Sequence, residues 1–556
     1  MATNAQNRPL SDEPRRVLRL EPGRARPPKS RLAAVLLVLG LIALIAPSFV
    51  HLNRFAQQLA ATLSATLGRD VTVEKVWLQL LPRPGFKIKN LTIADDSGFG
   101  AEPMIRSEEV IASLRIPSVW RGRLEIASLT LKEPSLNLVR DRSGRWNVEA
   151  LLERAARTPS APTAKVQAEV RPRFPYIEAE DGRVNIKFEQ EKKVYAMSAT
   201  DFSLWLASED EWNMRLAGRP IRSDANLSNT GKLKAEGSFK RAADLRATPI
   251  KLEVKLEDAQ LGQLTHLIYG FDRGWRGATN LSATFHGTPA DFTLSTDARV
   301  AGFRRYDIAR TDNLTLQNHC DAHYRAVAPT NDFVHARNFF LNVQCNSPVQ
   351  DGQLVLHAEL SPAESQPLVE VIAVSIPLSS VAAFARHAKK GVAEDLNATG
   401  TISGNLEWRQ GELGGSWVAS AVRLKSDALT APVTLGDLIF SVQRDLISTG
   451  TKSSGDTLVR LLPFSVPLGA PAPLTVQGSF SRSDYHLGVN GMADGTRLAA
   501  LFKALGLPMP VGVIPEATGL GKVELEVDGP WAGFAAPKAA GIVRPQSASV
   551  ARAGIK

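Results

Sequence analysis

The sequence predicts a mostly β protein, in which an N-terminal transmembrane helix precedes an elongated, curved antiparallel β-sheet. We expect this sheet to be groove-like and repetitive and to carry few short helices. Three observations predict it: apolar and polar residues alternate strictly over many segments, turn signals separate these segments, and one arrangement of segments recurs along the chain. The 556 residues are 44% hydrophobic and 22% charged, a composition that excludes a largely disordered chain.

The alternation is clearest in four segments. They read VNIKF at 184–188, FSLWL at 202–206, IKLEVKLE at 250–257 and VELEV at 523–527. A period of two places apolar side chains on one face of a strand and polar side chains on the other. Turn signals such as Asp181-Gly182 and Asp351-Gly352 separate the segments. These patterns predict half-buried strands that are joined mostly as hairpins or meanders.

The second half of the chain contains an internal repeat. Three blocks begin with an alternating strand and a short helix, at Leu252, Val369 and Tyr485, which are 117 and 116 residues apart. A glycine-led strand follows in each block, at Gly277, Gly400 and Gly519. A helix at matching places would not arise from chance alternation. We therefore predict repetitive growth of one structure with a period of about 117 residues.

The N-terminal segment has the pattern of a membrane anchor. Leu32 to Val50 are 19 residues without a charge, close to the length that crosses a bilayer. Residues 1–31 carry eight basic and three acidic side chains, which accounts for half of the net charge of +10. The positive-inside rule then predicts a single-pass protein of the inner (plasma) membrane, with a cytoplasmic N-terminus and a periplasmic body. A cleaved signal peptide is the alternative, although the basic region is long for one.

The same patterns divide the chain into regions. We expect a basic tail at 1–30, the transmembrane helix at 31–50 and a first domain at 51–158. A Pro-, Ser- and Thr-rich linker at 159–165 follows. We expect a β-rich middle region at 166–250 and the repetitive β region at 251–556.

Strands of this kind, added side by side, build a continuous apolar strip. Each strand adds about 4.8 Å, so twenty strands would give a strip of about 95 Å. Such a face needs a cover, which is either a second sheet in a closed sandwich or a ligand in an open trough. Alternation alone leaves both open. The positions that we expect to line an open groove are Leu252, Val254, Leu256, Ile402, Leu406, Trp408, Val523 and Leu525.

The first domain carries motifs of a known family. These are the Gly68-Arg69 turn, Pro84-Gly85 before a strand, Gly122 before another strand, and the string from Pro134 to Leu138 followed by Gly144-x-Trp146-Asn147. Over about 31–155 the chain resembles the N-terminal region of AsmA-family proteins. The glycine-led strands of 245–556 are similar to the repetitive C-terminal part of that family at the level of pattern. The third block stops at Lys556, so we expect either a short member or an incomplete one.

The resemblance implies a role in lipid transport. AsmA-like proteins are similar to bridge-type lipid transfer proteins, and the family is implicated in moving phospholipid toward the outer membrane and in outer-membrane assembly. An apolar trough would keep acyl chains out of water, which is worth about 0.8 kcal/mol per CH₂ group. The implied partners are phospholipids, the inner membrane and outer-membrane assembly proteins, and we expect no nucleic acid. The alternative is a scaffold or regulator of outer-membrane protein targeting and insertion that acts through protein contacts.

Catalytic motifs are lacking in the sequence. It contains no phosphate-binding glycine-rich loop, no His-Glu-x-x-His and no Gly-x-Ser-x-Gly. We therefore expect no enzymatic activity, no cofactor and no metal. His319-Cys320-x-x-His323, with His335 and Cys345, has a spacing that fits no usual zinc finger. A Cys320–Cys345 disulfide is the leading interpretation, and two free buried thiols are the alternative.

Several other residues have a structural and a functional interpretation. We expect the adjacent acids Asp95-Asp96 and Glu108-Glu109 to be turn or surface charges. We expect Trp146 to pack on the sheet and Asn147 to cap a helix. Three tryptophans in strand patterns either pack in the core or line the groove: Trp205, Trp408 and Trp417.

Overall fold

The computed structural model describes most of the chain from residue 69 onward. The described residues are 56–57, 60–61, 64, 69–80, 83–119, 126–149, 175–189, 191–208, 210–242, 245–327, 339–362, 367–409, 412–442, 459–481, 483–508, 517–530 and 535–550. The predicted tail at 1–30 and the predicted linker at 159–165 lie outside them.

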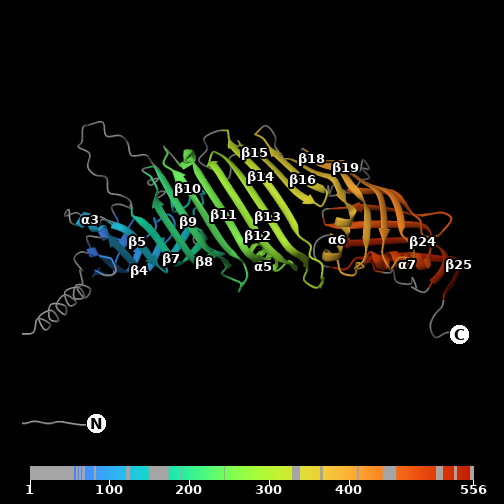
Figure 1. Ribbon diagram of the computed structural model, residues 1–556, viewed down its shortest axis with the longest axis horizontal. Helices are drawn as coiled ribbons and strands as arrows, with labels where there is room; N and C mark the ends of the chain where they lie inside the picture. The colour runs from blue at the N-terminus through green and yellow to red at the C-terminus, as the bar shows by residue number, and fades with distance from the viewer. Residues whose placement is uncertain are drawn as a thin grey trace, which may run out of the picture.

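Within the described residues, twenty-five strands form one long, curved sheet, with the strands lying across the long axis of the molecule (Figure 1). The strands of the N-terminal part are β1 (Val71–Thr72), β2 (Lys75–Gln79), β3 (Gly85–Ile93), β4 (Ile105–Leu114), β5 (Ile126–Lys132), β6 (Ser135–Arg140), β7 (Tyr176–Phe188), β8 (Glu191–Leu206), β9 (Glu211–Arg222) and β10 (Lys232–Lys240). The remaining strands are β11 (Ile250–Gln260), β12 (Trp275–Thr288), β13 (Asp291–Arg305), β14 (Leu316–Ala326), β15 (Phe339–Val349), β16 (Gly352–Leu360), β17 (Leu368–Pro377), β18 (Asn397–Arg409), β19 (Glu412–Lys425), β20 (Val433–Val442), β21 (Val459–Val466), β22 (Leu474–Phe480), β23 (Asp484–Asp494), β24 (Ala517–Pro530) and β25 (Lys538–Val550). The prediction of a mostly β fold with an elongated, curved sheet is confirmed.

The sheet is mixed, whereas the sequence predicted an antiparallel one. From β7 to β25 each strand pairs antiparallel with the next strand along the chain. The exceptions lie near the N-terminus, where β7 pairs in parallel with both β5 and β6. The connection from Arg140 to Tyr176 is 35 residues long, which is enough for the chain to return and run in the same direction. Alternation does not reveal strand direction, so the sequence could not show this.

The sheet is repetitive, as predicted. Three helices of the described blocks, α5 (Leu261–Tyr269), α6 (Leu378–Ala388) and α7 (Gly495–Ala504), begin at intervals of 117 residues. Each helix follows a strand of the sheet directly and lies along the same long edge of the molecule (Figure 1). In the first two blocks the preceding strand also carries a β-bulge at matching residues, Asp258 (φ 57°) and Ser375 (φ 47°), which are 117 residues apart.

Local signals fix the ends of these helices. The carboxylate of Asp494 accepts a hydrogen bond from the backbone N–H of Arg497 at 3.1 Å and so caps the N-terminus of α7. Gly270 ends α5 in the left-handed conformation (φ 82°), which glycine adopts without strain. Two smaller helical turns complete the described helices, α3 (Ile116–Val119) and η2 (Leu245–Ala247).

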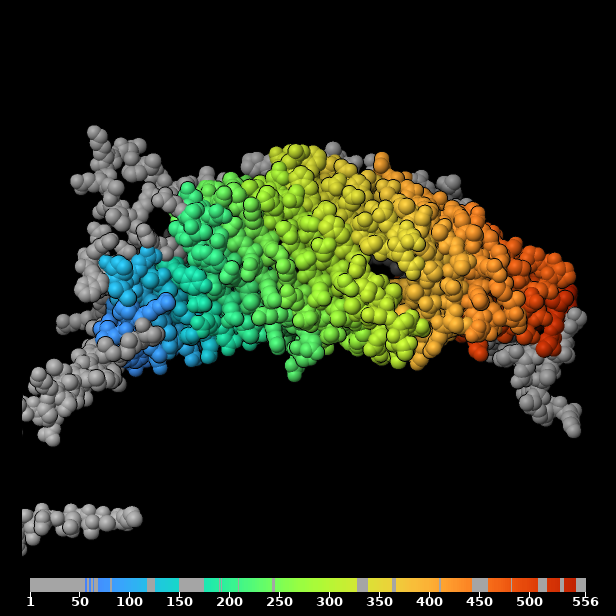
Figure 2. Space-filling model, in the orientation of Figure 1, coloured from blue at the N-terminus to red at the C-terminus, as the bar shows by residue number. Residues whose placement is uncertain are grey.

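Closed hydrophobic cores lie at the two ends of the molecule. The N-terminal core covers β1 to β4 and includes Val76, Ile88 and Val110, all at most 2% exposed. The C-terminal core is larger and packs α7 against β20 to β25. Among the described residues between them, small buried clusters lie beneath α5 and α6. Figure 2 shows one continuous curved body with an opening between its yellow-green and yellow-orange parts.

The predicted membrane anchor is not supported. The segment Leu32 to Val50 lies outside the described residues, and within the part that the structure describes no helix is long and apolar enough to span a bilayer. We therefore correct the predicted location as a single-pass inner-membrane protein with a cytoplasmic N-terminus and a periplasmic body.

Candidate functional site: an open apolar strip

An uninterrupted row of cross-strand neighbours runs through the middle of the sheet. Eleven consecutive strands, β9 to β19, each contribute one residue, and each residue lies directly opposite the next. This first row consists of Leu216, Ala235, Val254, Ala283, Thr296, Cys320, Cys345, Leu356, Val371, Leu406 and Gly415. At about 4.8 Å per strand, the row is roughly 48 Å long.

Two further rows run beside it on the same face, because residues two apart on a strand share a face. The second row is entirely apolar: Met214, Gly237, Leu252, Phe285, Leu294, Ala322, Val343, Ala358, Val369, Trp408 and Leu413. The third row is Gly218, Leu233, Leu256, Leu281, Ala298, Asn318, Ser347, Leu354, Ala373, Gly404 and Trp417. We call these three rows the apolar strip.

The middle of the strip is open. Most of its side chains, Leu252 and Val254 among them, are half-buried, neither packed away from water nor fully exposed. Among the described residues, the extensive contacts of β9 to β19 are with their hydrogen-bonded neighbours and with α5 and α6, and none is with a second sheet. The other face of the same strands carries exposed charges such as Lys251, Glu253 and Lys255. The described region therefore has one charged face and one uncovered apolar face.

An aromatic ladder begins in the second row of the strip and continues along its margin. Phe285, Phe292, Tyr324 and Phe339 lie on four successive strands, and their ring centroids are 4.7, 5.0 and 5.4 Å apart. Burial raises the pKa of the Tyr324 hydroxyl above its ordinary value of 10.0. The ladder gives the strip a rigid apolar margin along β12 to β15.

The eight residues predicted to line a groove separate into three groups. Leu252, Val254, Leu406 and Trp408 lie in the first two rows of the strip, and Trp408 is 40% exposed. Leu256 lies in the third row, where it packs with Leu264 of α5. Ile402 faces the same side and packs on the cluster beneath α6. Val523 and Leu525 are only 1% and 2% exposed in the C-terminal core, so they do not line open space. Alternation predicts the face of these residues, but it does not predict which part of that face is covered.

The tryptophans singled out in the sequence lie in different environments. Trp417 lies in the strip, and its ring N–H donates a hydrogen bond to the carbonyl oxygen of Val371 at 3.3 Å. Trp205 lies on the charged face, where Arg215 stacks over its ring at 5.3 Å. Trp146 lies against Phe188 of β7 with ring centroids 6.4 Å apart.

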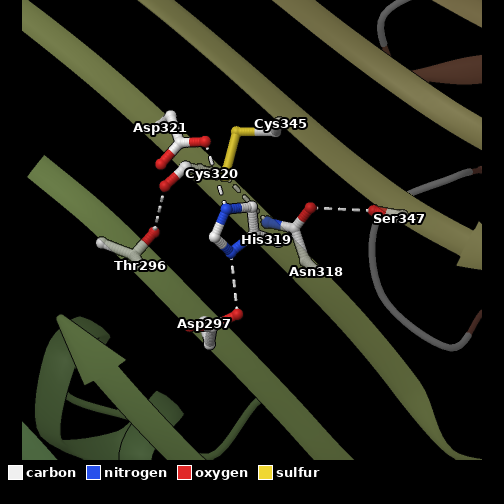
Figure 3. The surroundings of a disulfide bond; sticks show 8 residues. All are labelled: Thr296, Asp297, Asn318, His319, Cys320, Asp321, Cys345 and Ser347. Atoms are coloured by element: carbon white, nitrogen blue, oxygen red, sulfur yellow. Dashed lines mark hydrogen bonds and ion pairs between the residues drawn. A yellow bond between two sulfur atoms is a disulfide. The ribbon is translucent and has the colours of Figure 1, made fainter.

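A disulfide lies at the centre of the strip. Cys320 of β14 and Cys345 of β15 are direct cross-strand partners, and the structure joins them (Figure 3). Three polar side chains of the same face lie next to the bond (Figure 3). Asn318 donates to the Cys320 sulfur at 3.0 Å, Ser347 donates to the Asn318 side-chain oxygen at 2.9 Å, and Thr296 donates to the Cys320 carbonyl oxygen at 3.4 Å.

The histidines beside this disulfide face the other way. His319 lies on the charged face between Asp297 and Asp321, with ring nitrogens 2.8 and 3.1 Å from their carboxylates (Figure 3). The hydrogen bonds to Asp297 and Asp321 raise the pKa of His319 above 6.5. His323 pairs separately with Asp291 at 2.9 Å. Nowhere among the described residues do three or more His, Cys, Asp or Glu side chains form a cluster suited to a metal ion.

A hollow of about 1100 Å³ lies away from the strip. It is lined by residues 97–100, 140–145, 188, 189 and 191. Arg142 pairs with Glu189 and Arg145 pairs with Asp141 within it, so its charges largely neutralise each other. We therefore place the candidate site on the strip.

Comparison with known proteins connects this fold to a family. The model of the AsmA family matches residues 30–261. The chain belongs to the AsmA family over this region. No curated protein and no solved structure matches the chain significantly.

The motifs of the AsmA region meet in one buried polar network. Arg69 pairs with Asp95 at 2.7 Å, and both side chains are at most 3% exposed. Asn147 donates to the Asp95 carboxylate at 2.5 Å, and its backbone oxygen accepts from Arg69 at 2.9 Å. The Asn147 side chain also accepts from the backbone N–H of Val139 at 3.1 Å. These contacts hold the loop after β3, the segment after β6 and the start of β1 together.

This network corrects two predictions. Asn147 is fully buried and uses its side chain inside the network, so the expected helix-capping role is wrong. Asp95 is buried as well, so the prediction of a turn or surface charge is wrong for it, whereas Asp96 is 59% exposed and pairs with the same arginine at 3.0 Å. Adjacent acids look alike in sequence, and only the packing of the AsmA region makes one buried and the other exposed. In the second acidic pair, Glu109 forms an ion pair with Lys87 at 2.8 Å on the surface of the AsmA region.

The apolar strip crosses the end of the AsmA region. The match ends at residue 261, where α5 begins, so β9 to β11 lie inside it and β12 to β19 lie beyond it. The strip is therefore shared between the AsmA region and the repeated blocks that follow.

Proposed function

We propose that this protein binds phospholipids by laying their acyl chains along the apolar strip of β9 to β19. In this role it shields lipid from water and conducts it in support of outer-membrane assembly. The observation that carries the proposal is that the first and second rows stay in register over eleven strands, are mostly half-buried, and are covered by no second sheet among the described residues. Membership of the AsmA family and the large curved sheet are consistent with lipid transport or outer-membrane assembly.

The energetics support a lipid occupant. Burial of apolar surface is worth about 25 cal/mol per Å², so an uncovered strip of this length is costly in water. One bilayer leaflet contributes about 15 Å to a hydrocarbon core of about 30 Å. A strip of roughly 48 Å therefore has room for about three lipid lengths placed end to end. Transfer along it needs no covalent step, and we accordingly propose no enzymatic activity.

Charged substitutions in the strip test the proposal. We expect Val254→Glu combined with Leu406→Glu to reduce the binding of a fluorescent phospholipid at least tenfold, because each carboxylate makes that part of the strip polar. The matched control is Lys255→Glu combined with Glu407→Lys, which changes charges at the neighbouring positions. Circular dichroism would verify that both variants keep their strands. If the strip variant binds lipid as the wild type does, the proposal is wrong.

A scaffold that captures other proteins is a second candidate function. The observation that favours it is β25, which pairs only with β24 within the described part of the chain and so offers a sheet edge. Pro545 lies in this strand and removes one backbone donor, which makes the edge a poor template for a long partner strand. Deletion of β25 would abolish partner capture under this hypothesis and would leave lipid binding along β9 to β19 intact.

A further inference from the structure

The polar residues of the apolar strip are confined to one place. Within its three rows, Thr296, Asn318 and Ser347 are the side chains that carry a hydroxyl or an amide. They lie on the adjacent strands β13, β14 and β15, around the disulfide (Figure 3). The strip is apolar on both sides of them, from Leu216 to Ala283 and from Leu356 to Leu406 in the first row.

Hydrogen bonding within the cluster leaves one donor available. The Ser347 hydroxyl donates to the Asn318 side-chain oxygen, and this bond fixes the direction of the amide. One N–H of that amide points to the Cys320 sulfur, which is a weak acceptor. The structure shows no partner for the second N–H among the described residues, and Asn318 is only half-buried. A polar hydrogen is therefore presented within an apolar surface.

We propose that Asn318, oriented by Ser347, binds the ester carbonyl of a diacyl lipid whose chains lie along the strip. An ester carbonyl is a hydrogen-bond acceptor placed directly at the head of an acyl chain, so it suits one donor surrounded by apolar side chains. The two apolar stretches that flank the cluster would receive the chains. The disulfide holds β14 and β15 together at this point and so keeps Asn318 and Ser347 in register. This inference rests on the proposed lipid binding and adds the chemical class of the lipid.

Paired lipids test the inference. The probes are a diester phosphatidylglycerol and its diether analogue with the same chains and headgroup, each competing with a fluorescent phospholipid for the full-length protein. We expect the wild type to bind the diester about three- to tenfold more tightly, the range that one net hydrogen bond supplies. Asn318→Leu is expected to remove this preference by weakening diester binding and leaving diether binding unchanged. Ser347→Ala is expected to reduce the preference, because it frees the amide to rotate.

Asn346→Leu is the matched control, since it makes the same change on the charged face one residue from Ser347. It is expected to keep the preference for the diester. Equal binding of both lipids by the wild type, or an equal loss for both in Asn318→Leu and Ser347→Ala, would overturn the ester site and leave lipid binding intact. Failure of the wild type to bind either lipid would overturn the proposed function itself.

Discussion

At the scale of single residues, we predict that the neighbours Asp95 and Asp96 of the buried network contribute unequally to the free energy of unfolding. Asp95→Ala leaves the Arg69 guanidinium buried without its main partner. We expect it to lower the free energy of unfolding by about 3 kcal/mol, as is typical when one partner of a buried ion pair is removed. Urea unfolding followed by tryptophan fluorescence measures this. Asp96→Ala is the control, because its exposed carboxylate should contribute no more than about 1 kcal/mol.

A second residue-scale prediction concerns pH. Hydrogen bonds to Asp297 and Asp321 raise the pKa of His319, so the folded state holds this proton more tightly than the unfolded state. The resulting stabilisation is complete below pH 6.5, the ordinary pKa, and is lost as the pH rises through the raised value. An NMR titration should place the His319 midpoint above 6.5, and Asp297→Asn should lower it. An unchanged midpoint in that variant would show that the carboxylate does not act on the ring.

At the scale of elements, the glycine-led strands of the repeat need glycine for a steric reason. Gly400 has φ of 112°, and a Cβ atom there would lie 2.4 Å from the carbonyl oxygen of Ser420. We expect Gly400→Ala to destabilise the protein by about 1–3 kcal/mol, measured as a lower urea midpoint. Gly414→Ala is the control on the neighbouring strand, where the nearest atom is 4.0 Å away. Equal effects of the two changes would contradict this explanation.

We predict that the disulfide stabilises the pairing of β14 and β15. It closes a loop with a sequence separation of 25 residues, which includes the hairpin between these strands. Loop-closure entropy predicts that the double variant Cys320→Ser and Cys345→Ser is about 3 kcal/mol less stable. Hydrogen exchange should localise the loss to amides of β14 and β15. Uniformly faster exchange across the sheet would contradict a local role.

The elements also show what the sequence can predict. A period of two predicted the strands and their apolar face. The repeated strand-and-helix blocks at Leu252, Val369 and Tyr485 predicted the helices that begin at Leu261, Leu378 and Gly495. The sequence pattern did not show that β7 runs parallel to β5 and β6, because the direction of neighbouring strands depends on the connections between them and not on their periodicity. For the same reason Val523 and Val254 look equivalent in sequence, although α7 and the curled C-terminal strands bury only the first.

At the scale of the whole molecule, the sheet has a hydrophobic core at each end and an uncovered apolar face in its middle. The N-terminal and C-terminal cores bury the apolar face of the sheet, and β9 to β19 leave it uncovered. The molecule therefore behaves as a trough of about 48 Å within a longer sheet. Under the proposed function, lipid would enter and leave through the uncovered face of the strip.

The most direct test of this account is native mass spectrometry of the full-length protein purified without detergent. We predict a folded chain that carries up to about three phospholipids, which are released together when Val254→Glu and Leu406→Glu make the strip polar. A wild-type chain that is folded, retains its strands by circular dichroism and carries no phospholipid, even after incubation with lipid vesicles, would contradict it.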